Sequence, residues 1–152
     1  MQKDTAVTPM SPIIQFEQYY KDEFIHIHLD PRLSLLQVEW CKHPQSSEFR
    51  AVFQKLAGVV LDTKVKYWLS DPRAIHYLEL GDQNWLIKDM APLLKQSSLL
   101  KFARLVTKES LEMMDIVQIL GNLEKTLDLE IQTQFELFVN REDALEWLLA
   151  DL

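Results

Sequence analysis

The spacing of apolar residues first changes near Pro44, and that change limits the folds available to the chain. Before Pro44, apolar and polar side chains alternate, as in half-buried strands, over three segments: 13–20, 24–30 and 35–41. Short polar turns (KD and DPR) separate these segments. Because short links join antiparallel neighbours, the sequence predicts a three-stranded meander.

After Pro44 the apolar spacing becomes helical. Ser46 or Ser47 is the expected N-cap of a helix. Its core stripe is Phe49, Val52, Phe53, Leu56 and Val60. The next segment, 65–70, is apolar on both faces, which predicts a central strand covered by helices on each side.

The rest of the chain alternates helices with strands. A helix is expected to open at Asp82, with Leu86, Met90, Leu93 and Leu94 in its core stripe, and to kink or split at Pro92. Strands are expected at 100–106 and 135–139. A helix capped by Thr107 is expected between them, with Met113, Ile116, Val117, Leu120 and Leu127 as its stripe, and Asn140 is expected to cap a last helix. The order βββ-α-β-α-β-α-β-α predicts an α/β domain over 13–152 with a mixed sheet of about six strands. Residues 1–12 are expected to be a flexible tail.

Charge and composition exclude several classes of partner. The 152 residues carry a net charge of −7 with scattered basic residues, which argues against a nucleic-acid or anionic-membrane partner. No apolar run reaches the ~20 residues of a membrane span, and the N-terminus has no secretory apolar segment, so a cytoplasmic protein is expected. The single cysteine, Cys41, is expected to be a half-buried inert thiol.

The segment "HIHLD" has the spacing most typical of a metal site. His26, His28 and Asp30 share one face of a strand, and two imidazoles with a carboxylate suit zinc or iron. The alternative is that this face is the solvated side of the meander, since Ile25, Ile27 and Leu29 form the opposite face. No third ligand is evident from the spacing, which favours the second interpretation.

The end of the central strand is the other candidate site. Asp71 and Arg73 follow the strand at the edge where open α/β sheets bind ligands, and Asp82 stands at a helix start. Arg73 is a candidate to hold an anion, with Tyr77 and Trp85 nearby. Ordinary turn chemistry at Asp71-Pro72, with Arg73 paired to a surface carboxylate and Trp85 packed over the 72–81 loop, is the favoured alternative.

Three local patterns resemble a known family. They are "LSDPR" followed by "GDQNWLIKDMAP", the strand "LKFARLV", and the closing "FELFVNREDALEWLL". Together they resemble the small STAS-like domains of bacteria, relatives of the anti-sigma-factor antagonists, over residues 13–150. The resemblance implies a non-catalytic interaction module. Antagonist members carry a phosphorylated Ser or Thr at a helix start, but Ser70 precedes Asp71-Pro72 here and the turn 83–85 has no hydroxyl, so no phosphorylation site is expected.

Three functions follow from these observations. The leading hypothesis is a cytoplasmic regulatory module, without cofactor, that docks a protein or a second copy of itself through the Asp71–Trp85 surface. The alternative is a domain that binds a small anionic or apolar ligand at the same edge. A metal-dependent enzyme using His26 and His28 is the third. The chain has no Gly-rich phosphate loop and no complete catalytic motif, which argues against an enzyme.

Overall fold

All the strands of this computed structural model, which describes residues 12–109 and 133–152, lie in one sheet in the order of the sequence. They are β1 (Glu17–Lys21), β2 (Ile25–Asp30), β3 (Leu35–Trp40), β4 (Tyr67–Asp71), β5 (Lys101–Leu105) and β6 (Gln134–Phe138). Strands β1, β2 and β3 pair antiparallel, whereas β3, β4, β5 and β6 pair parallel. The predicted α/β fold with an N-terminal meander and a parallel portion is therefore confirmed.

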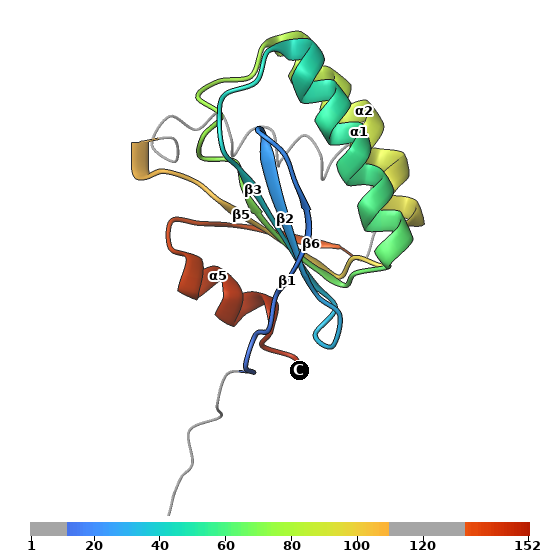
Figure 1. Ribbon diagram of the computed structural model, residues 1–152, viewed down its shortest axis with the longest axis vertical. Helices are drawn as coiled ribbons and strands as arrows, with labels where there is room; N and C mark the ends of the chain where they lie inside the picture. The colour runs from blue at the N-terminus through green and yellow to red at the C-terminus, as the bar shows by residue number, and fades with distance from the viewer. Residues whose placement is uncertain (1–11, 110–132) are drawn as a thin grey trace, which may run out of the picture.

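The described helices lie on both faces of the sheet (Figure 1). Helices α1 (Ser46–Thr63) and α2 (Leu80–Gln96) lie over one face, and α5 (Arg141–Leu148) lies over the other. Strand β4 is buried on both sides: Trp68 belongs to the cluster under α1, while Tyr67 and Leu69 pack towards α5. The two-sided apolar pattern of segment 65–70 correctly predicted this central position.

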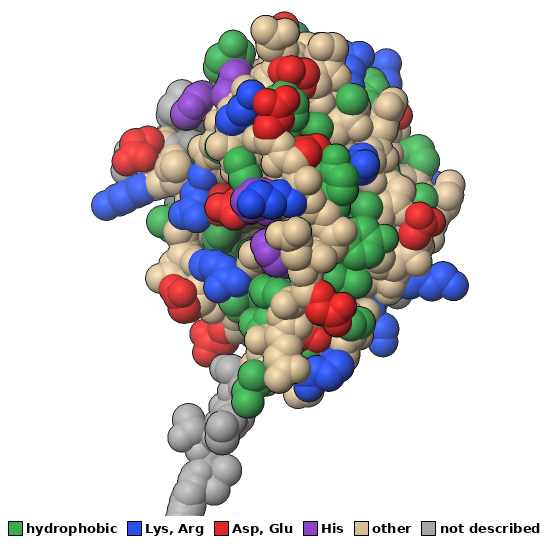
Figure 2. Space-filling view, viewed as in Figure 1, with side chains coloured by type: hydrophobic (Ala, Val, Ile, Leu, Met, Phe, Trp, Pro, Cys, Tyr) green, Lys and Arg blue, Asp and Glu red, His purple; other side chains and the backbone are tan. Residues whose placement is uncertain are grey.

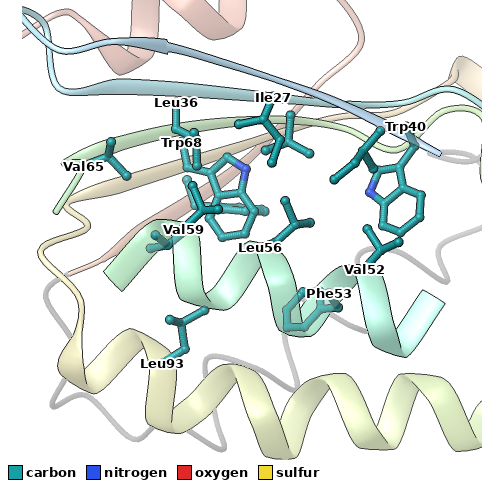
Figure 3. Packing of buried hydrophobic residues seen from close by; sticks show 14 of the residues in the cluster. Ile27, Leu36, Trp40, Val52, Phe53, Leu56, Val59, Val65, Trp68 and Leu93 are labelled. Carbon is teal, nitrogen blue, oxygen red and sulfur yellow. The ribbon is translucent and has the colours of Figure 1, made fainter. Parts of the chain in front are cut away.

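The core under α1 is the larger of the two. Its inner layer joins β2, β3, β4 and β5 to α1, as Figure 3 shows, and includes Ile27, Leu36, Trp40, Val52, Phe53, Leu56 and Trp68. The second core, between the sheet and α5, contains Leu35, Tyr67, Leu69, Ala103, Leu105, Ala144 and Leu148. Both faces of β4 and β5 are thus largely buried, as their sequences require.

Strand β1 begins later than its alternation predicted. The backbone before it is held by side chains instead of a strand ladder: the N–H of Gln15 donates to Asp30 Oδ2 at 2.7 Å, and Arg32 donates to the carbonyl of Ile13 at 2.8 Å. Because these backbone groups are already satisfied, the residues before Glu17 gain nothing from extending the strand pairing.

Both long helices start at residues other than the expected caps. Gln45, not Ser46 or Ser47, is the N-cap of α1, and its N–H donates to Glu48 Oε1 at 2.9 Å. Glu79, not Asp82, is the N-cap of α2. The hydroxyl of Ser46 and the carboxylate of Asp82 bind each other at 2.7 Å, so a contact between the helices uses the two side chains that were expected to cap them.

Two other helix predictions concern Pro92, where α2 does not split, and Asn140, whose role as a cap is confirmed. Helix α2 continues through Pro92, because Leu93 beside it is buried in the core and this packing offsets the lost backbone hydrogen bond. Asn140 caps α5 as predicted, accepting from the N–H of Asp143 at 3.1 Å. The stripe expected after Thr107, from Met113 to Leu127, lies outside the described residues.

The connection from β4 to α2, residues 72–79, folds back over the sheet edge. Ile75 and Leu78 pack against the larger core, while Tyr77 and Leu80, the first residue of α2, are 65% and 71% exposed. The segment therefore covers the core with one side and presents apolar side chains outward with the other.

Candidate functional site

A cavity lies between the sheet and α1 at the carboxyl ends of β3, β4 and β5. Most of its lining is apolar and aromatic: Trp40, Phe49, Phe53, Leu56, Trp68, Pro72, Ile75, Leu78, Leu86, Phe102 and Phe135. Ser70 and Arg104 are the polar side chains among the described lining residues. An apolar pocket with a few convergent polar groups, at the edge where open α/β sheets bind ligands, is the usual form of a small-molecule site.

The polar groups of this cavity come from neighbouring strands. Ser70 of β4 lies directly opposite Arg104 of β5, and two residues earlier Trp68 lies opposite Phe102. Residues two apart on a strand project from the same face. Trp68, Ser70 and Arg104 therefore form one small patch of the sheet surface under α1.

The guanidinium of Arg104 has no counter-ion in the described part of the chain. Its Nε is fully buried and has no hydrogen-bond partner. Burial lowers the pKa of Arg104 to about 10, so the group stays protonated at neutral pH. The other cation of β5, Lys101, donates to the carbonyl of Trp147 at 2.7 Å and pairs with Asp151 at 3.1 Å. Arg104 is thus a charged side chain in an apolar cavity without the partner that its neighbour has.

A second donor at this cavity also lacks a partner. Trp68 is 2% exposed, and its indole Nε1 is buried without an acceptor in residues 12–109 and 133–152. In Figure 3 this nitrogen is on the side of the ring that faces Trp40, towards the carboxyl end of the strands. Buried donors are nearly always satisfied in native proteins, so two unsatisfied donors on one cavity indicate a missing acceptor.

The cavity is small. The volume open to the centres of water molecules is about 50 Å³. At about 10–15 Å³ for each water, that volume accommodates roughly three to five water-sized groups. The site suits a compact molecule rather than a nucleotide or a long lipid chain.

Asp71 and Arg73 bind each other outside the cavity. Arg73 Nε and Nη2 donate to the two carboxylate oxygens of Asp71 at 2.8 and 2.9 Å, and Arg73 N also donates to Oδ1. The hydrogen bond to Asp71 raises the pKa of Arg73. The arginine expected to hold an anion is therefore engaged with a surface carboxylate, the arrangement that ordinary turn chemistry predicted.

Asp82 and Trp85 lie where α1 meets α2. Asp82 is 4% exposed and accepts from Ser46 Oγ at 2.7 Å and Arg50 Nε at 2.8 Å. Burial would raise the pKa of Asp82, but these hydrogen bonds and the Arg50 charge outweigh it and lower the pKa. Trp85 contacts the rings of Phe49 and Phe53, with Arg50 above its own ring. These contacts place Trp85 against α1.

Tyr77 belongs to a small aromatic contact that ties the 72–79 segment to the residues before α1. Its ring centroid lies 4.5 Å from that of His43. The N–H of His76 donates to His43 Nδ1 at 3.1 Å, and the two imidazoles stack. These contacts hold one side of the segment that covers the cavity.

The strand histidines are separate from this cavity. The rings of His26 and His28 are 6.5 Å apart and half-buried, so their face is not simply solvated. The carboxylate of Asp30 is fully buried and accepts backbone N–H groups from Gln15, Arg32 and Leu33. Across residues 12–109 and 133–152, no three His, Cys, Asp or Glu side chains are placed to hold a metal ion.

The thiol of Cys41 is exposed, not half-buried as predicted. Partial desolvation and the nearby Glu39 carboxylate raise its pKa. Since the thiolate is the nucleophile, a raised pKa lowers the fraction of Cys41 in the reactive form.

The sequence contained one overlooked signal for the cavity. Arg104 is a charged residue within the apolar strand "LKFARLV", and it alternates with residues that face α5. A charge on the dry side of a strand is rarely tolerated without a partner or a function. The same sheet edge was a candidate site from the sequence, but with Arg73 and not Arg104 as the candidate anion partner.

Comparisons of the chain with protein-family models, curated proteins and solved structures gave no match. Among the helices of the described residues, none has the length and apolar character needed to cross a membrane.

Proposed function

We propose that this domain is a non-catalytic binding module whose ligand is a small anion with an apolar body. The ligand occupies the cavity at the carboxyl ends of β3, β4 and β5. The observation that carries this proposal is the protonated Arg104, which has no counter-ion among the described residues and lies in a mostly apolar lining. The small anionic or apolar ligand expected at the 70–85 edge is retained, with Arg104 in place of Arg73 as the anion partner.

The energetics favour a ligand over a purely structural role. A buried ion without a partner costs several kcal/mol, and a core position of this kind is usually apolar. An anionic ligand would supply the missing charge, and Ser70 offers a hydroxyl beside it. The unliganded domain therefore carries an electrostatic cost that binding would relieve.

A regulatory role, as the STAS-like resemblance implies, follows from the wall of the cavity. Ile75 and Leu78 line it from the 72–79 segment, and the same segment presents Tyr77 to the outside. A ligand that moves this wall would also change the exposed surface. The proposal is therefore a cytoplasmic bacterial module whose protein partner, or second copy, contacts residues 72–80.

Thermal denaturation in the presence of single anions tests the binding proposal. A ligand at 100 times its dissociation constant should stabilise the domain by about 2.7 kcal/mol. Arg104→Met should abolish this shift. Arg141→Met is the matched control. Arg141 is the first residue of α5, on the opposite face of the sheet, and its guanidinium donates to Gln37. If no anion stabilises the wild type, or if both variants respond alike, the proposed site is wrong.

A further inference from the structure

We infer that the ligand of this cavity is a short-chain monocarboxylate, the size of acetate or propionate, held by Arg104, Trp68 and Ser70. This inference rests on the proposed function and specifies the chemistry of its ligand. Three properties of the cavity lead to it: its charge, the arrangement of its donors and its volume.

The charge of the cavity matches a single negative charge. Arg104 is the only cationic side chain among the described lining residues, and the lining has no histidine or lysine. A carboxylate would be neutralised by this one guanidinium. A phosphate or sulfate dianion would bring a second charge into apolar surroundings without a partner, which is strongly unfavourable. The absence of a Gly-rich loop from the three-glycine sequence points the same way.

The unpartnered donors of the cavity suit a ligand with two acceptor oxygens rather than one. The unpartnered atoms are a guanidinium Nε–H on β5 and an indole Nε1–H on β4, from residues that share one face of adjacent parallel strands. A carboxylate presents two acceptor oxygens on one carbon, so each oxygen can meet a different strand. Ser70 lies directly opposite Arg104 and two residues after Trp68 on β4, and its hydroxyl is a third possible donor to the carboxylate.

The volume and lining determine the rest of the molecule. A cavity of about 50 Å³ holds roughly three to five water-sized groups, so a three-atom carboxylate leaves room for at most about two further carbon atoms. The walls around that space are aromatic rings, among them Trp40, Phe53 and Phe102. These walls favour a methyl or ethyl group over a hydroxyl or an amine, because they offer no partner for a polar substituent.

The indole N–H signals of the four tryptophans provide a direct test, using the full chain labelled with ¹⁵N. Acetate, propionate, butyrate and hexanoate are titrated as sodium salts, with chloride, sulfate and phosphate at equal ionic strength. The Trp68 signal, assigned by its loss in Trp68→Phe, should shift with acetate and propionate. We expect dissociation constants of about 0.1–10 mM, since ligands this small make few contacts. Hexanoate should bind at least about tenfold more weakly because it exceeds the cavity.

The variants separate charge from geometry. Arg104→Met should weaken propionate binding by at least about tenfold, whereas Arg104→Lys should retain part of it and Arg141→Met should leave it unchanged. If Arg104→Met does not fold, Trp68→Phe supplies the same test. Its affinity for propionate, followed by tryptophan fluorescence, should be about tenfold lower than that of the wild type.

Each alternative outcome has a separate meaning. If sulfate or phosphate shifts Trp68 and the carboxylates do not, the carboxylate assignment is overturned while the binding proposal stands. If hexanoate binds more tightly than propionate, the short-chain assignment is overturned. If no anion shifts the Trp68 signal, both the inference and the proposed function fail.

Discussion

Replacing Arg104 by methionine should make the unliganded protein more stable, which is unusual for a change in a buried lining residue. Methionine has a similar volume, extends as far as the position of Arg104 Nε, and removes the charge. The change eliminates an ion that has no counter-ion in the described residues and leaves the apolar walls of the cavity intact. Replacements of buried charged groups by apolar residues of similar volume have stabilised other proteins by about 1–4 kcal/mol.

The size of the effect follows from the pKa of Arg104. Burial lowers it from the ordinary arginine value to about 10, which at about 1.4 kcal/mol for each pKa unit corresponds to about 3 kcal/mol. Arg104 keeps some accessible area in the cavity wall, and solvent there reduces this cost. We therefore expect the free energy of unfolding to rise by about 1–2 kcal/mol, or about 2–8 °C in Tm for a domain of this length.

Urea denaturation at pH 7, in a buffer without carboxylate, measures this change. The denaturation midpoint should rise at constant m value, and Arg141→Met should not raise it. Raising the pH adds an internal check. The pKa of Arg104 is lower in the folded state, so the native protein releases this proton at a lower pH than the unfolded chain does. The wild type should therefore gain stability relative to the variant as the pH rises above about 10. A destabilised Arg104→Met would show that the guanidinium is satisfied in the native protein, and would refute the electrostatic reasoning.

Three further changes test other parts of the structure. Asp82→Asn should cost about 1–3 kcal/mol by weakening the contacts with Ser46 and Arg50. Since the pKa of Asp82 is lowered, its contribution to stability is complete above the ordinary value of 3.8 and is lost as the pH falls below it. In urea denaturation at a series of acid pH values, the free energy of unfolding of the variant should therefore fall less steeply with pH than that of the wild type. Trp85→Ala should cost about 2–4 kcal/mol in the same assay, because it opens the α1–α2 contact; a loss below about 0.5 kcal/mol would place Trp85 outside the core. The double change Tyr77→Ala and Leu80→Ala should alter Tm by only a degree or two, since both side chains are exposed, and a large drop would show that this surface is structural.

Periodicity predicted the fold well because burial here follows local spacing. The alternation in β2 and β3, and the two-sided apolar pattern of β4, each determine which faces must be covered. The helix starts were harder to predict. Ser46 and Asp82 have ideal capping chemistry, but α1 and α2 bring them together across 36 residues, and that tertiary contact replaces both caps.

The candidate site was predictable only in part for the same reason. The pairing of Asp71 with Arg73 is local, so turn chemistry anticipated it. The lack of a partner for Arg104 is a property of the assembled sheet, in which β4 and α1 surround it with apolar groups. No spacing rule reveals which charge will be left without a counter-ion after strands from distant segments come together.

The sequential order of the strands has a consequence for synthesis on the ribosome. Each strand of the described sheet pairs with the one made just before it, so the sheet can grow by one edge as the chain emerges. The vulnerable stage comes once β4 has joined and β5 has not. At that moment a strand with apolar side chains on both faces forms the open edge, the kind of edge that recruits other chains. Rapid translation through α2 and β5 would shorten this exposure, whereas a pause there would favour aggregation of the nascent domain.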